Sequence, residues 1–189
     1  MSGQEAIVAS ISDALPPNLS FRPSPGASWC LDRRQTRWYV QGSDSYSPGS
    51  GVQVMRWRIS AGPNEWLSPN SVRLQFDFTP KDGNMKPLAN AQCLFSRLTI
   101  RANNALLEDV QNYHMSYAVF EKCLTRAARE REAGMGFPMS SLSADGEVEY
   151  EAMLQDKKYT VSVNLLSGLF LQPKWIWPHA MPLDISLEI

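Results

Sequence analysis

The chain alternates apolar and polar residues over several short segments, and this period of two is typical of β-strands that bury one face. In the clearest segment, residues 72–78, every even position is hydrophobic and every odd position is polar. Residues 55–59, 159–165 and 183–189 alternate in the same way. The pattern predicts a mainly β domain whose core includes the following residues: Val72, Leu74, Phe76, Val161, Val163, Ile185 and Leu187.

Turn-forming residues separate these segments. Residues 47–51, 61–64 and 81–84 are rich in residues that favour turns, such as Gly, Pro, Asn and Asp. Two further apolar runs meet at Asn103-Asn104, and asparagine tolerates the left-handed conformations of a tight hairpin turn. We therefore expect a hairpin at these asparagines. Many short strands joined by turns favour an all-β, eight-stranded sandwich.

The hydrophobic period changes in residues 112–134. Apolar residues recur three or four positions apart there, while charged residues take the opposite face, which is typical of an amphipathic helix. Asn112 suits the N-cap position and Gly134 suits the end of such a helix. We expect one helix packed on the sandwich, with the following residues on its inner face: Tyr113, Tyr117, Phe120 and Leu124.

The N-terminal region differs in composition from the rest of the chain. Residues 12–28 are rich in Pro, Ser and Gly, so we expect an extended arm over residues 1–34 and one domain over residues 35–189. The formal net charge of −1 provides no overall attraction for nucleic acid. We favour a solvated arm without this contact, and any contact with nucleic acid would be weak and local to the basic arm. The arginines concerned are Arg22, Arg33, Arg34 and Arg37.

No apolar run approaches the roughly 18 residues that a membrane helix needs, and the first 20 residues lack the pattern of a secretory signal. We therefore expect no membrane span. The three cysteines, Cys30, Cys93 and Cys123, are widely spaced and odd in number, which argues against a disulfide framework and favours a reducing compartment.

The sequence offers little catalytic chemistry. The two histidines, His114 and His179, lie far apart without an adjacent ligand pattern, and no nucleophile, phosphate-binding or metalloprotease motif occurs. The alternating acids Glu147, Glu149 and Glu151 are interpreted as a solvated edge or loop rather than a paired-acid site. We expect no catalytic residue, metal ligand or cofactor. A β-sandwich enzyme of unknown type is kept only as a third hypothesis.

Tryptophan is the most informative residue type in the chain. Trp175-Ile176-Trp177-Pro178 places two tryptophans close together, and neighbouring positions cannot all face one core. Such residues make either a sugar-stacking platform or a protein interface, where tryptophan buries a large area at a small entropic cost. We favour the interface, because no acidic calcium-binding loop accompanies the pair.

A series of motifs follows a distinctive order. Leu94-Phe95-Ser96 precedes the asparagine turn, and Asn112-Tyr113 opens the predicted helix. The other motifs of the series are residues 45–49, 65–71, 166–170 and 182–189. Over residues 38–189, this order resembles the N-terminal jelly roll of the major capsid proteins of Polinton-like, adintovirus-like and related large double-stranded DNA viruses. The resemblance implies an eight-stranded jelly-roll sandwich. Because those proteins carry two jelly rolls, we expect this chain to be the first of two and to end early; a single-jelly-roll capsid subunit or an endogenised viral remnant is the alternative.

The resemblance implies a structural viral or virus-derived protein that assembles with copies of itself and other capsid subunits into capsomers of an icosahedral shell. Trimeric capsomers are expected if a second jelly roll follows. The resemblance places the protein in the virion and, during assembly, in the host cytoplasm or nucleus. We expect these residues at subunit contacts: Trp66, Tyr113, His114, Tyr117, Trp175 and Trp177. The alternative is a carbohydrate-binding β-sandwich module that uses Trp175 and Trp177.

Overall fold

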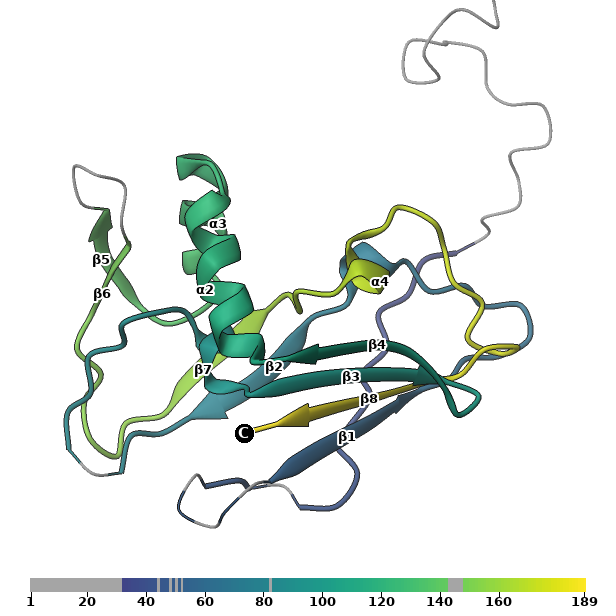
Figure 1. Ribbon diagram of the computed structural model, residues 1–189, viewed down its shortest axis with the longest axis horizontal. Helices are drawn as coiled ribbons and strands as arrows, with labels where there is room; N and C mark the ends of the chain where they lie inside the picture. Colours follow the sequence, from purple (N-terminus) through teal and green to yellow (C-terminus); the bar gives the residue numbers. More distant parts are fainter. Residues whose placement is uncertain are drawn as a thin grey trace, which may run out of the picture. The chain divides into compact units, whose positions relative to one another are not determined.

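The computed structural model describes residues 32–43, 45–47, 49, 51, 53–81, 83–142 and 148–189, with the side chains of Ala133 and Leu142 excepted. The chain divides into two units, Met1–Arg37 and Trp38–Ile189, and all the elements described below belong to the second (Figure 1). Some of the residues on which predictions were made lie outside the described residues: the proline-rich segment, Arg22, Cys30 and Glu147. In the first unit, the described arginines are exposed: Arg33, Arg34 and Arg37.

The larger sheet has four antiparallel strands in the order β1-β8-β3-β4, which lie side by side in Figure 1. Their register places apolar residues opposite one another across three strands. Trp57 pairs with Ile185, and Ile185 pairs with Ile100. The bounds of the strands are Val54–Ile59 for β1, Leu183–Glu188 for β8, Arg97–Ala102 for β3 and Ala105–Gln111 for β4.

Two smaller sheets complete the β structure. Strands β2 (Leu74–Phe78) and β7 (Tyr159–Val163) pair antiparallel, and this register places Phe76 opposite Val161. Strands β5 (Met139–Leu142) and β6 (Val148–Tyr150) form a separate antiparallel pair. The described part of the chain is therefore mostly β, with eight strands in sheets and few helices, as the alternation predicted.

The pairing of the strands is nested along the chain. The first strand pairs with the last, and the second pairs with the last but one. These contacts join segments more than 80 residues apart, as in the pair Phe76 and Val161. The two ends of the second unit are therefore held together by backbone ladders rather than by side chains alone.

The inner faces of the larger sheet and of the β2–β7 pair meet in one hydrophobic cluster. Its fully buried members include Leu98, Ile100 and Leu187, and Leu74 and Phe76 of β2 pack against it. A second cluster lies around Val161 and Val163 of β7 and continues to residues of the 137–153 segment: Phe137, Tyr150 and Met153. The predicted core positions are thus buried, or partly buried against these clusters: Val72, Leu74, Phe76, Val161, Val163, Ile185 and Leu187.

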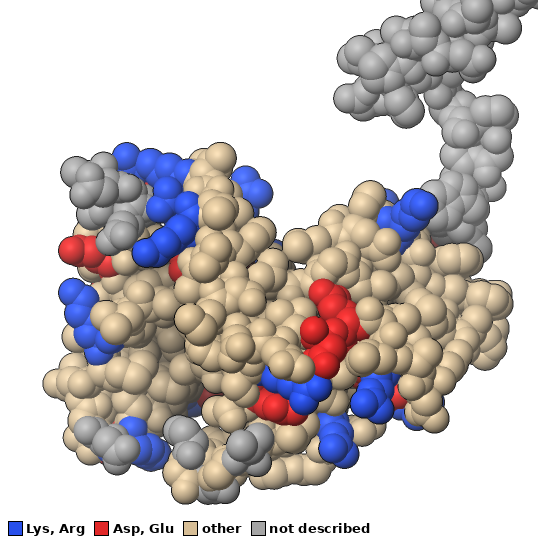
Figure 2. All heavy atoms as spheres, viewed as in Figure 1, with Lys and Arg blue, Asp and Glu red and all other residues tan. Residues whose placement is uncertain are grey.

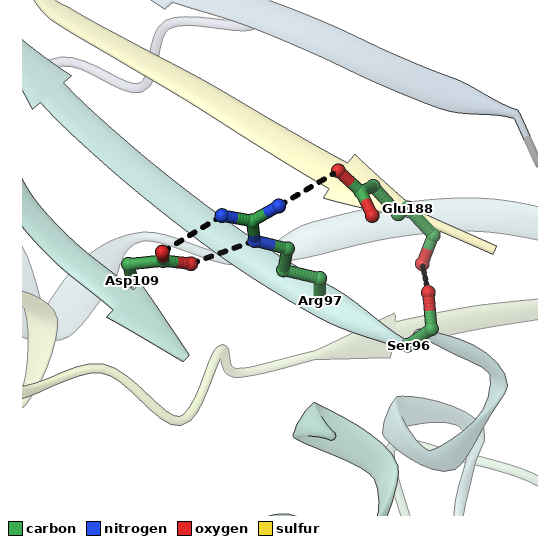
Figure 3. Close-up of polar contacts among 4 residues, drawn as sticks. All are labelled: Ser96, Arg97, Asp109 and Glu188. Atoms are coloured by element: carbon green, nitrogen blue, oxygen red, sulfur yellow. Dashed lines mark hydrogen bonds and ion pairs between the residues drawn. The ribbon is translucent and has the colours of Figure 1, made fainter. Parts of the chain in front are cut away.

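The outer face of the larger sheet is polar and is tied together by Arg97 of β3. Its guanidinium forms a two-pronged hydrogen bond with Asp109 of β4 at 2.7 and 2.8 Å (Figure 3). The third nitrogen of the group, Nη1, lies 3.7 Å from the Glu188 carboxylate of β8. The fork geometry of arginine suits such double contacts. One side chain therefore links three neighbouring strands.

The hairpin prediction is confirmed. Strands β3 and β4 are joined by Asn103 and Asn104, whose φ angles are 48° and 65°. These left-handed values match the right-handed twist of the paired strands, and asparagine tolerates them better than most residues. Asn103 also donates a hydrogen bond from Nδ2 to the carbonyl of Ala180, at 3.1 Å.

The prediction of a single helix was wrong, because two helices occupy the segment: α2 (Tyr113–Cys123) and α3 (Arg126–Ala133). Leu124 is extended, and the Thr125 hydroxyl accepts a hydrogen bond from the backbone N–H of Ala128. Threonine thus caps a second helix, and this satisfies a backbone donor that would otherwise lack a partner.

Asn112 and Gly134 occupy the predicted end positions of this helical segment. Asn112 precedes α2, but its side chain makes no capping bond and its backbone is left-handed. Gly134 follows α3 in ordinary right-handed geometry. The described chain also contains three short helical pieces: η3 (Pro69–Ser71), η4 (Ala91–Leu94) and α4 (Gly168–Leu171).

Candidate functional site

The candidate site is an exposed aromatic surface, which we call the tryptophan face: Trp66, Trp175, Trp177 and His179. It is built on an isolated antiparallel bridge in which Leu67 and Ile176 exchange backbone hydrogen bonds of 2.8 and 2.9 Å. Leu67 and Ile176 are buried in the core. Because side chains alternate along extended chains, the tryptophans on either side of the bridge are directed outward.

The rings of the tryptophan face are held in fixed positions. The rings of Trp66 and Trp177 stack with centroids 5.9 Å apart and an interplanar angle of 18°. The indole Nε1 of Trp177 donates to the carbonyl of Pro63 at 2.9 Å, and the His179 ring lies 5.7 Å from that of Trp177. Trp66 remains 57% exposed, Trp175 37% and Trp177 38%. A pre-ordered apolar surface of this kind loses little conformational entropy when it binds.

Three of the six predicted contact residues therefore lie on one surface: Trp66, Trp175 and Trp177. Tyr113 and Tyr117 lie elsewhere. Both are residues of α2 whose side chains are buried in the core, 0% and 2% exposed. The phenol of Tyr113 accepts a hydrogen bond of 2.7 Å from the backbone N–H of Leu166. Burial raises the pKa of both phenols well above the usual value. These two side chains are buried by their own chain.

His114 is half-buried on α2, and its backbone carbonyl accepts a hydrogen bond from the thiol of Cys93 at 3.4 Å. Burial raises the pKa of the Cys93 thiol to about 11. A thiol with this pKa is protonated at neutral pH and is a poor nucleophile. The pair therefore lacks the activated sulfur that cysteine catalysis requires.

Glu121 and Tyr150 form a partly buried contact between the helical segment and the β5–β6 pair. The hydroxyl of Tyr150 donates to the Glu121 carboxylate at 3.0 Å, and the contact joins α2 to β6. Burial raises the pKa of Glu121 despite this hydrogen bond. The neighbouring Glu132 raises it further, although by less. The contact has a clear structural role, because it holds the helices against the β5–β6 pair.

The sequence did not reveal a cleft of about 230 Å³ between the helices and the segment that leads to α4. Figure 2 shows a hollow between these two parts of the surface. The residues lining the cleft are Tyr117, Phe120, Leu124, Ala128, Arg131, Glu132, Asn164, Leu165, Leu166 and Leu171. In the sequence, only the apolar spacing of Phe120 and Leu124 indicated a buried helix face here. That spacing is the same whether the face is fully packed or borders an open cleft.

Within the described residues, no group of three or more His, Cys, Asp or Glu side chains is arranged to hold a metal ion. No helix in that same part of the chain has the length and apolar character needed to cross a membrane. No protein-family model matches the chain, and no curated protein matches its sequence at a significant level.

Proposed function

We propose that the chain is a structural subunit that assembles with copies of itself and other subunits into a viral or virus-derived capsid, through a jelly-roll domain. The tryptophan face is the principal contact surface in this proposal. The observation that carries it is the ordered, solvent-exposed stack of Trp66 and Trp177 on a mostly β body. Assembly needs complementary surfaces and no bond-breaking chemistry.

The nested strand pairing supports the jelly-roll part of the proposal. A jelly roll folds a long antiparallel hairpin over on itself, so that its outermost strands pair with each other and the next strands do the same. The pairs β1–β8 and β2–β7 follow this rule. Strand β4 differs, because it remains beside its hairpin partner β3 at the edge of the larger sheet.

The energetics of tryptophan support an interface role for the exposed stack. Tryptophan is enriched at the few interface positions that dominate binding, and each such position typically contributes about 2 kcal/mol or more. The bridge and the Trp177–Pro63 hydrogen bond fix the rings before any contact forms. Repetition of the same contact in a closed assembly then multiplies a modest interaction.

A carbohydrate-binding module is the second candidate, and the 57% exposure of Trp66 favours it. A sugar stacks on an open ring face, whereas the stack already covers one face of both Trp66 and Trp177. The shared ring contact therefore makes the assembly role the better supported one. Glycan-array binding that disappears in Trp177→Ala would favour the sugar-binding role instead.

Sedimentation velocity over a wide concentration range tests the proposal, together with electron microscopy of the concentrated protein. We expect concentration-dependent assembly of the wild-type chain and its loss in Trp66→Ala/Trp177→Ala. Tyr39→Ala is the matched control, because Tyr39 is an aromatic residue that is 78% exposed outside the tryptophan face. A wild-type chain that stays monomeric at every concentration, also when the downstream reading frame is included, would overturn the proposal.

A further inference from the structure

His179 is the ionisable member of the tryptophan face. Its ring centroid lies 5.7 Å from that of Trp177, with an interplanar angle of 41°, and its side chain is exposed. Trp177 is fixed in turn by its stack with Trp66 and by its hydrogen bond to the carbonyl of Pro63. A partner that covers the Trp177 ring therefore also approaches the imidazole.

The backbone that carries His179 is anchored on both sides. The buried Pro178 precedes it. After it, the carbonyl of Ala180 accepts a hydrogen bond from Nδ2 of Asn103 at 3.1 Å, and the N–H of Met181 donates to the carbonyl of Trp177 at 3.1 Å. The imidazole therefore stays beside the indole when a partner covers the face.

The charge of the imidazole affects the free and the covered face in opposite ways. Histidine is the side chain whose charge ordinarily changes between pH 5 and 8. In a free copy, water and the neighbouring indole of Trp177 stabilise the charged ring. A contact that covers the face removes this water, and burial of a charge without an opposite partner is costly. Protonation of His179 therefore favours the free copy.

The charged groups around His179 do not offset this cost. The elements that contact its segment carry the following charged side chains: Lys174, Glu65, Arg58, Arg101, Glu108 and Asp184. Each carboxylate contacts another group. Glu65 accepts from the N–H of Gly62 at 2.8 Å, and Glu108 accepts from the hydroxyl of Ser167 at 2.5 Å. Asp184 lies 3.9 Å from Nε of Arg58.

The cation next to the tryptophans works in the same direction. Lys174 is exposed directly before Trp175 on the segment that carries His179. A second copy that presents the same face adds another lysine and another histidine. At low pH the contact between copies therefore brings like charges together, which disfavours association.

We propose that protonation of His179 releases the contact that the tryptophan face makes between copies of this chain. The proposal rests on the proposed self-assembly and assigns a regulation to the same surface. The free copy binds more protons than the assembled one, so association weakens as the pH falls through the range in which histidine titrates. Between about pH 7.5 and about pH 5.5, the association constant should fall roughly tenfold for each histidine that the contact buries.

Sedimentation velocity at these two pH values and constant ionic strength tests the proposal. His179→Gln keeps a polar, uncharged side chain and should associate equally at both pH values. His179→Arg carries a permanent charge and should associate weakly at both. His114→Gln is the matched control, because His114 is the only other histidine of the chain and lies half-buried on α2, outside the tryptophan face. This control should keep the wild-type response.

Tryptophan fluorescence of the dilute protein provides a second measurement that does not depend on assembly. Protonation places a charge beside the indole of Trp177 and should lower its fluorescence. The wild-type chain and His114→Gln should show this titration in the pH range of histidine. His179→Gln and Trp177→Phe should lack it, and the difference from wild type separates this signal from the other tryptophans.

These measurements separate the failure of this inference from the failure of the proposed function. Wild-type association that requires Trp66 and Trp177, but responds to pH equally in His179→Gln, overturns the inference alone. Association that strengthens at the lower pH, or a fluorescence titration that persists in His179→Gln, does the same. A wild-type chain that stays monomeric at both pH values and every concentration, also with the downstream reading frame, overturns both proposals.

Discussion

The tryptophan face and the α2 segment contain similar aromatic residues, but the fold treats them in opposite ways. Trp66, with its ring open to solvent, is 57% exposed, whereas Tyr113 and Tyr117 are 0% and 2% exposed. The tryptophans flank a bridge whose own residues fill the core, while the tyrosines recur at helical spacing and face that core themselves. The difference shows that aromatic content marks an interface only where neighbouring residues already satisfy the core.

The largest expected effect concerns the anchoring of the helical segment. A Cβ atom at Gly136 would overlap the side-chain amide of Asn90, which is fully buried and hydrogen-bonded. Gly136→Ala should therefore lower the free energy of unfolding by about 3 kcal/mol or more, through overpacking and lost hydrogen bonds. Urea denaturation followed by far-UV circular dichroism measures this change. Gly134→Ala is the control, since its nearest contact would be an ordinary 3.4 Å, and equal losses in both variants would contradict the explanation.

The next effect separates the two buried tyrosines. Tyr113→Phe removes the acceptor of the Leu166 N–H and should cost about 1–3 kcal/mol, because a buried donor loses its partner. Tyr117→Phe should be neutral or stabilising, since the Tyr117 hydroxyl has no partner within the described residues. The free energies of unfolding of both variants provide the comparison. A costly Tyr117→Phe would reveal a hidden partner of that hydroxyl.

On the tryptophan face, the expected change is in association rather than folding. Trp66→Ala and Trp177→Ala should each weaken self-association roughly tenfold or more, as loss of a dominant interface residue does. Their coupling in a double-mutant cycle of unfolding should be about 0.5–1.5 kcal/mol, the usual value for an aromatic pair. Sedimentation velocity and urea denaturation measure the two quantities. Unchanged association in both variants would remove this surface from the proposed interface.

The smallest effect is a pH dependence in the helical segment. Because burial raises the pKa of Glu121 in the folded chain, the native state holds a proton on this group that the unfolded state releases at the same pH. This group's contribution to stability should therefore fall as the pH rises from the ordinary carboxyl pKa of 4.5 through the raised value. Glu121→Gln keeps an acceptor for Tyr150 and should remove that slope from stability profiles. An identical slope in both proteins would assign it to other groups.

Local pattern predicted much of the candidate site. Trp66 and the pair Trp175 and Trp177 were expected at contacts, and the structure brings all three to one surface. The stack itself was not predictable, because 111 positions separate Trp66 from Trp177 and long-range contacts such as the bridge between Leu67 and Ile176 bring them together. The break between α2 and α3 was locally encoded by the capping Thr125, yet the continuous helical spacing concealed it.

Local residue patterns specify the positions of the main strands, the asparagine hairpin and the inward side of those strands, because a period of two and left-handed turn residues are local properties. Which strands pair, which aromatic residues are covered and where a cleft stays open are properties of the folded chain. Those features depend on contacts between residues far apart in the chain, such as Trp57 with Ile185 and Phe76 with Val161. The same local pattern can therefore lead to a buried or an exposed aromatic residue, depending on which distant residues pack against it.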